Sequence, residues 1–194
     1  MIMSGLSKAL NGFVPSRRRG SGANSTGSSR YRVANSFGSN IFYGDLVKLD
    51  GGFIEVITTT TDYSTGVFQG CEYIDPVSKQ PTFSNYYPSG VSSAVGNVTA
   101  FVVDDPAATY IVQADASVSV GDVNLNFDVT LGAGSSFTGV SGFGIIATSR
   151  VETTAMVRVL DIYGEPGNNF SDANPKVEVR LVQHVDADVS SHDA

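Results

Sequence analysis

The sequence has one cysteine, two histidines and no tryptophan among its 194 residues. A single cysteine, Cys71, excludes an intramolecular disulfide and any metal site built from several cysteines. The two histidines, His184 and His192, leave little scope for chemistry that depends on an imidazole, and no serine lies in a Gly-x-Ser-x-Gly motif. We therefore expect no catalytic residues, no metal site and no cofactor, and we expect that the protein is not an enzyme.

Charged residues and long apolar runs are also scarce. Charged residues make up 16% of the chain, against about 25% in an average globular protein. Gly, Ser, Thr, Asn and Val are abundant instead, a composition that disfavours helices and favours strands and turns. No apolar run approaches the ~18 residues of a membrane-spanning helix, so we expect no membrane partner.

The charges divide the chain into two parts. Residues 1–38 contain six basic residues and no acidic one, whereas residues 39–194 contain all 19 acidic residues and only six basic ones. The segment from Ser16 to Arg30 is rich in Gly and Ser and has almost nothing apolar to bury, which is typical of flexible segments. We therefore predict an extended, flexible N-terminal arm over residues 1–38 and a single β-rich domain over residues 39–194.

Two kinds of side chain make this arm a candidate binding segment. Its first apolar residues recur about every four positions, as in a short helix that forms only against a partner. Its arginines suit an acidic protein surface or nucleic-acid phosphates. We predict that the arm binds neighbouring protein subunits through Ile2, Leu6, Leu10, Phe13, Arg17, Arg18, Arg19, Arg30 and Arg32. A solvated tail without a specific role and a nucleic-acid-binding segment are the alternatives, and the acidic body disfavours nucleic acid.

From residue 39 onward the sequence shows strand and turn patterns. Residues 46–49 and 53–57 flank Asp50-Gly51-Gly52, which predicts a tight hairpin because glycine accepts the positive φ angles of the turn. Asp104-Asp105-Pro106 predicts a turn, since Pro cannot donate a hydrogen bond within a sheet. Further strands are predicted at residues 66–74, 97–103, 109–114, 155–163 and 176–184.

Alternation within the last predicted strand distinguishes its two faces. Val177, Val179 and Leu181 share one face, which we expect in the core, and Glu178 and His184 share the other, which we expect in water. About eight strands, with at most one or two short helices, predict an all-β fold. A single barrel or sandwich domain is the usual way to avoid long exposed strand edges.

Two adjacent tyrosines, Tyr86 and Tyr87, lie in a loop-like segment before Pro88. Aromatic residues are enriched at protein interfaces, so we predict that Tyr86 and Tyr87 contribute to an interface. Stacking against a sugar ring and filling the core beneath a loop are the alternatives. Cys71, which lies within a predicted strand, is expected to be a small buried apolar residue.

Several short motifs, taken in order, resemble a known class of virion protein. They are residues 40–49 (NIFYGDLVKL), 66–73 (GVFQGCEY), 86–90 (YYPSG), 100–106 (AFVVDDP) and 110–114 (YIVQA). This order is similar to that of the head-decoration proteins of tailed bacteriophages, also called cement or head-stabilising proteins, especially those of marine and cyanobacterial phages. The likeness covers roughly residues 40–185.

The resemblance implies a β-rich, often trimeric protein on the outer surface of the virion. Such proteins bind the assembled capsid and clamp neighbouring subunits of the major capsid protein, and the family has no catalytic residues. We therefore expect a capsid decoration protein that forms a homotrimer and uses the N-terminal arm as a tether. A virion-surface adhesin that binds host glycans through its loops is the alternative.

Overall fold

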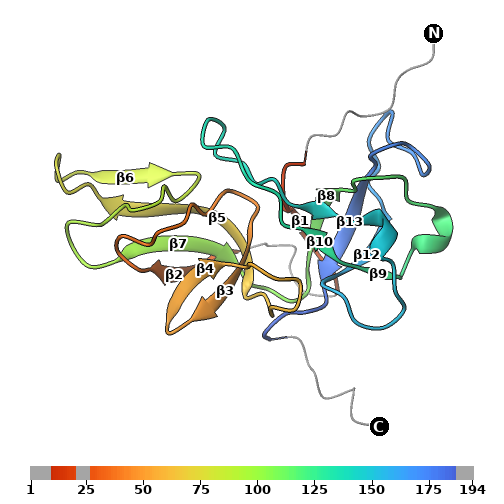
Figure 1. The fold of residues 1–194 in the computed structure, drawn as a ribbon, viewed down its shortest axis with the longest axis horizontal. Coiled ribbons are helices and arrows are strands. Elements are labelled where there is room, and N and C mark those ends of the chain that lie inside the picture. The colour runs from red at the N-terminus through yellow and green to blue at the C-terminus, as the bar shows by residue number, and fades with distance from the viewer. Residues whose placement is uncertain (1–9, 21–26, 187–194) are drawn as a thin grey trace.

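The structure, a computed structural model, describes residues 10–20 and 27–186 of the chain (Figure 1). Nearly all of its regular structure is β, and two 3-10 turns of three residues each are the only helical elements of the described part. Antiparallel sheets pack in a sandwich-like arrangement, which confirms the predicted all-β class. The strands are β1 (Val14–Arg18), β2 (Ser29–Val33), β3 (Leu46–Asp50), β4 (Phe53–Val56), β5 (Gly66–Ile74), β6 (Pro81–Ser84), β7 (Val98–Val103), β8 (Ala108–Gln113), β9 (Asn126–Phe127), β10 (Val129–Thr130), β11 (Gly144–Ile145), β12 (Val157–Ile162) and β13 (Lys176–Leu181), and the turns are η1 (Val120–Asp122) and η2 (Ala147–Ser149).

A six-stranded sheet forms the first half of the molecule. Its strands lie in the order β2-β7-β5-β3-β4, and β6 pairs with β5. The predicted hairpin is confirmed: β3 and β4 pair with Asp50 opposite Phe53, and Gly51 and Gly52 adopt φ angles of 54° and 88°. The sheet curls so that β2 approaches β4. It encloses a core of Val33, Ile41, Val47, Ile54, Phe68, Cys71, Tyr87, Val98, Ala100 and Val102.

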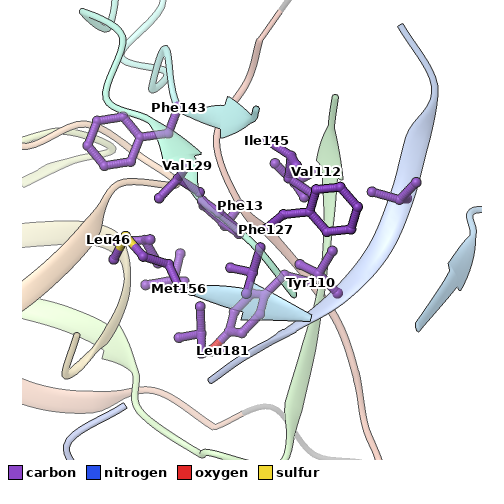
Figure 2. Close-up of a cluster of buried hydrophobic side chains, with 14 of the residues drawn as sticks. Phe13, Leu46, Tyr110, Val112, Phe127, Val129, Phe143, Ile145, Met156 and Leu181 are labelled. Carbon is purple, nitrogen blue, oxygen red and sulfur yellow. The ribbon is translucent and has the colours of Figure 1, made fainter. Parts of the chain in front are cut away.

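A five-stranded sheet in the order β1-β8-β13-β12-β9 forms the second half, and the short pair β10 and β11 lies beside β8. Val177, Val179 and Leu181 of β13 point into its core, as their alternation predicts. Figure 2 shows this core, in which the ring of Phe13 meets the ring of Tyr110 edge to face at 6.2 Å. Edge-to-face contact is a favoured aromatic geometry, so this pair adds to the burial of both rings.

The two sheets share the larger core. The predicted turn at Asp104-Asp105-Pro106 is present, and it carries the chain from β7 in the six-stranded sheet to β8 in the five-stranded sheet. Leu46 and Val67, from strands of the six-stranded sheet, belong to the same cluster of buried side chains as the five-stranded sheet's residues. The apolar faces of both sheets are therefore covered partly by one another.

The segment that composition predicts to be a flexible arm contains two strands. β1 is an edge strand of the five-stranded sheet, paired with β8, and β2 is an edge strand of the six-stranded sheet, paired with β7. The prediction of an arm that extends from the domain is therefore wrong for residues 14–18 and 29–33. The Gly and Ser content of a segment indicates only its local flexibility. A segment with few apolar side chains can still be ordered, because pairing with a distant strand satisfies its backbone hydrogen bonds.

Two predicted water-facing residues of the last strand are buried. The His184 side chain is 0% exposed, and its Nδ1 accepts a hydrogen bond from the backbone N–H of Asp186 at 3.0 Å. Glu178 is covered because Arg17 and Thr109 bond to its carboxylate. Other segments of the chain cover both residues. Alternation within one strand cannot predict this cover, because it carries no information about those segments. No helix of the described part is long and apolar enough to cross a membrane.

Candidate interaction surface

A narrow hairpin loop over residues 132–142 projects from the body, between the two sheets (Figure 1). Ser135 and Val140 form an antiparallel bridge at its neck, and the N–H of Gly139 donates to the carbonyl of Ser135 at 2.7 Å. The neck is anchored to the segment before β3 by two backbone hydrogen bonds. The N–H of Tyr43 donates to the carbonyl of Gly139, and the carbonyl of Tyr43 accepts from the N–H of Ser141. These bonds hold the loop in one position relative to the body.

Close packing around two glycines fixes the loop against the six-stranded sheet. The Asn85 side chain, just after β6, donates to the carbonyl of Thr138 at 3.0 Å and occupies the space where a Cβ of Gly139 would lie. The Phe42 ring likewise occupies the space where a Cβ of Gly134 would lie. Gly139 also has a φ of 72°, which favours glycine. The glycines of this segment therefore permit close contact as well as the turn.

The loop and β6 carry exposed aromatic side chains. Phe137, at the tip of the loop, is 97% exposed, and Phe83 of β6 is 71% exposed. Asn85 joins the two elements, since it lies two residues after Phe83 and bonds to the residue after Phe137. We call Phe83 and Phe137 the aromatic surface. Moving a large aromatic side chain out of water lowers the free energy, so this surface is suited to binding another molecule.

The structure separates the two tyrosines that the sequence predicts at an interface. Tyr86 is partly buried, and its ring stacks on Phe42 at 5.5 Å between centroids, so it supports the base of the hairpin loop. Tyr87 is fully buried, and its hydroxyl donates to the carbonyl of Val91 at 2.7 Å. The prediction of an interface role is therefore wrong for Tyr87, because pairing with Ile41 turns its ring into the core.

The apolar residues predicted in the arm do not act together in the described part of the chain. Phe13 is fully buried in the core of the five-stranded sheet, which excludes it as a contact for a neighbouring subunit. Leu10 is partly buried and packs against Gly144. Ile2 and Leu6 lie outside the described residues.

The arginines predicted in the arm divide between the two sheets. Arg17 forms a bidentate pair with Glu178, with both N–O distances at 2.7 Å, and Arg18 pairs with Asp105 at 2.6 Å. Arg19 continues the edge of the five-stranded sheet, where its backbone N–H donates to Ala107. In the six-stranded sheet, Arg30 contacts Glu72 at 3.4 Å and lies over the ring of Phe101, and Arg32 is exposed.

Sequence patterns do not single out Phe83 and Phe137 as binding residues. Each is one apolar residue among polar neighbours, and burial depends on the elements that pack around it. The signal that points to Phe137 is its place in a stretch with Gly132, Gly134 and Gly139. In a glycine-rich turn, a large aromatic residue has no neighbouring apolar side chains to pack against, so it is expected to be exposed.

Titratable groups in the described part of the chain are mostly paired or isolated. No group of three or more His, Cys, Asp or Glu side chains in residues 10–20 and 27–186 is arranged to hold a metal ion. A pocket of about 450 Å³ lies between Val14, Ile111 and Tyr163, and its carboxylate, Glu165, is bonded to Lys176 at 2.7 Å.

Comparison with protein-family models, curated proteins and solved structures finds no match to this chain.

Proposed function

We propose that this protein is a structural virion protein that decorates the outer surface of an assembled phage capsid and stabilises it by clamping neighbouring major capsid subunits. The aromatic surface is the observation that carries this proposal. A decoration protein must add contact area to a shell that has already assembled, and two exposed phenylalanines on a fixed loop and an adjacent strand offer that area without a folding step.

Two further observations support a binding role. The order of motifs across residues 40–185 resembles that of head-decoration proteins, and it includes Tyr86, which supports the aromatic surface through Phe42. The hydrogen bonds at the neck of the hairpin loop reduce the conformational entropy that Phe137 loses on binding. We further propose a homotrimer, in keeping with the same resemblance.

The test uses full-length protein and expanded capsids that lack it. Phe83→Ser combined with Phe137→Ser should weaken co-sedimentation with the capsids about tenfold or more, because truncating an aromatic residue central to an interface typically costs over 1 kcal/mol. Val120→Ser is the matched control: Val120 is exposed and lies in η1, away from the six-stranded sheet. Its binding should equal that of the parent protein.

Point substitutions are required because deletion of residues 1–38 would remove β1, β2 and the buried ring of Phe13. Equal capsid binding by the double variant and the parent protein would refute the role of the aromatic surface. Binding of the parent protein to a glycan array, lost in the double variant, would instead support an adhesin. Sedimentation velocity of the parent protein measures the proposed trimer.

A further inference from the structure

Three arginines lie in one row across the outer face of the five-stranded sheet. The row runs from Arg17 on β1 through Thr109 on β8 and Arg180 on β13 to Arg158 on β12, since each of these residues is paired in register with the next. Asn126 on β9 completes it, opposite Arg158. On β8, β12 and β13 the strand neighbours of these residues point into the core, so the row lies on the outer face, where Arg180 is exposed and Arg158 is partly exposed.

Two arginines of the row, Arg158 and Arg180, have no carboxylate partner within the described part of the chain. Glu178 pairs with Arg17 and accepts a hydrogen bond from Thr109. Arg158 donates only to the neutral amide oxygen of Asn126, at 2.8 Å. No described carboxylate lies within 4 Å of the guanidinium of Arg158 or Arg180.

A directly opposed pair of arginines opposes folding of the sheet, because like charges opposite one another on adjacent strands repel. Desolvation, Arg158 and Arg19 together hold the pKa of Arg180 below its usual value. A neutral side chain at either position would remove this repulsion. A bound anion would also remove it, and would make use of both guanidinium groups.

We propose that Arg158 and Arg180, with Arg19 beside them, form a binding site for a carboxylate-rich segment of a partner protein. Guanidinium groups bind carboxylates through two parallel N–H donors, and an opposed pair presents two such forks on a flat face. The hydrogen bond from Arg158 to Asn126 holds one of these forks in place. The proposal goes beyond the proposed function, because it rests on the other sheet and on different residues from the aromatic surface.

The charges around the row favour a short acidic peptide over nucleic acid. Asp161 and Glu178 are paired in register in the next part of the same two strands, and the whole chain has a net charge of -7. A long phosphodiester chain would extend past the arginines toward these carboxylates and would be repelled by them. A segment with two or three carboxylates satisfies Arg158 and Arg180 without reaching further.

The experiment titrates full-length, isotope-labelled protein with a blocked tetraglutamate peptide and follows the Nε–Hε signals of arginine by NMR. Saturable shifts centred on Arg158 and Arg180 are expected, and a tetraglutamine peptide should cause none. Arg158→Gln combined with Arg180→Gln should weaken the apparent affinity about tenfold or more. Arg32→Gln, which removes an exposed arginine of the six-stranded sheet, is the control and should change it less than twofold.

Three results would overturn the proposal. Shifts from tetraglutamate that are spread evenly over all arginines would show nonspecific attraction, and this readout needs no variant. An equal loss of affinity in the control variant would show the same. Tighter binding of inorganic phosphate or of a 20-base-pair DNA than of tetraglutamate would identify a phosphate site instead. The assay contains no capsid, so its failure and the failure of the proposed function are distinguishable.

Discussion

Asp45 is a buried carboxylate whose ionisation should destabilise the fold. Its side chain is 2% exposed. The Oδ2 atom accepts the backbone N–H of Phe42 at 2.8 Å, and no hydrogen bond reaches Oδ1. Burial raises the pKa of Asp45 from 3.8 to about 6, and the Ser141 hydroxyl and the Phe42 N–H only partly oppose this effect. The native state therefore holds the proton more tightly than the unfolded chain does.

The direction of the pH dependence follows from the raised pKa. The favourable contribution of protonated Asp45 is complete below pH 3.8 and is lost as the pH rises through about 6. The difference between a pKa of 3.8 and one of about 6 corresponds to about 3 kcal/mol. Asp45→Asn keeps an oxygen for the N–H of Phe42 and cannot ionise. We expect it to raise the free energy of unfolding above pH 7 by up to about 3 kcal/mol.

Urea denaturation of parent and variant at several pH values between 4 and 8 measures this effect. The difference between the two proteins should be small at pH 4 and should grow through pH 6. Asp62→Asn is the control with the opposite sign: desolvation raises the pKa of Asp62, but hydrogen bonds from Thr58, Lys48 and Thr59 together outweigh it, so the pKa lies below its usual value. A constant difference between Asp45→Asn and the parent protein across this pH range would refute the reasoning.

Three further predictions concern the buried residues and the edge strand β1. Phe13→Ala should lower the free energy of unfolding by about 3–5 kcal/mol, since it leaves a cavity beside Tyr110; a loss below 1 kcal/mol in urea denaturation would mean that Phe13 is not part of the core. Arg17→Gln should lower the midpoint of thermal unfolding at pH 7, because it leaves the carboxylate of Glu178, whose side chain is 10% exposed, without its ion-pair partner, and an unchanged midpoint would contradict this. Burial raises the pKa of Cys71 to about 12, so its thiol should react with a chromogenic disulfide at pH 8 only after urea unfolds the protein, and immediate reaction of the native protein would be inconsistent with the structure.

Local patterns were sufficient for the strands whose side chains alternate. The hairpin around Gly51 and Gly52, the buried face of Val177 and Val179, and the buried thiol of Cys71 are all confirmed. In each case the deciding information lies within a few residues: two glycines that accept positive φ angles, or a period of two along a strand. The all-β class follows from the same local rules applied along the whole chain.

The candidate surfaces could not be predicted in this way. Residues 14–18 and 29–33 resemble a flexible arm by composition, yet they pair with residues that follow 65 to 97 positions later in the chain. Tyr86 and Tyr87 are adjacent and identical, yet one supports the aromatic surface and the other fills the core. The row that joins Arg17, Arg158 and Arg180 exists only because β1, β12 and β13 share a sheet.

The amino-acid sequence alone determined the strands whose side chains alternate and the turns whose glycines accept positive φ angles, because these patterns act over a few residues. The tertiary structure decided which strands are neighbours and what covers each face. Charge pairing, burial and exposure all depend on residues far apart in the chain, so Phe13 is a core residue, Phe137 is exposed and the arginines lie side by side only in the folded protein.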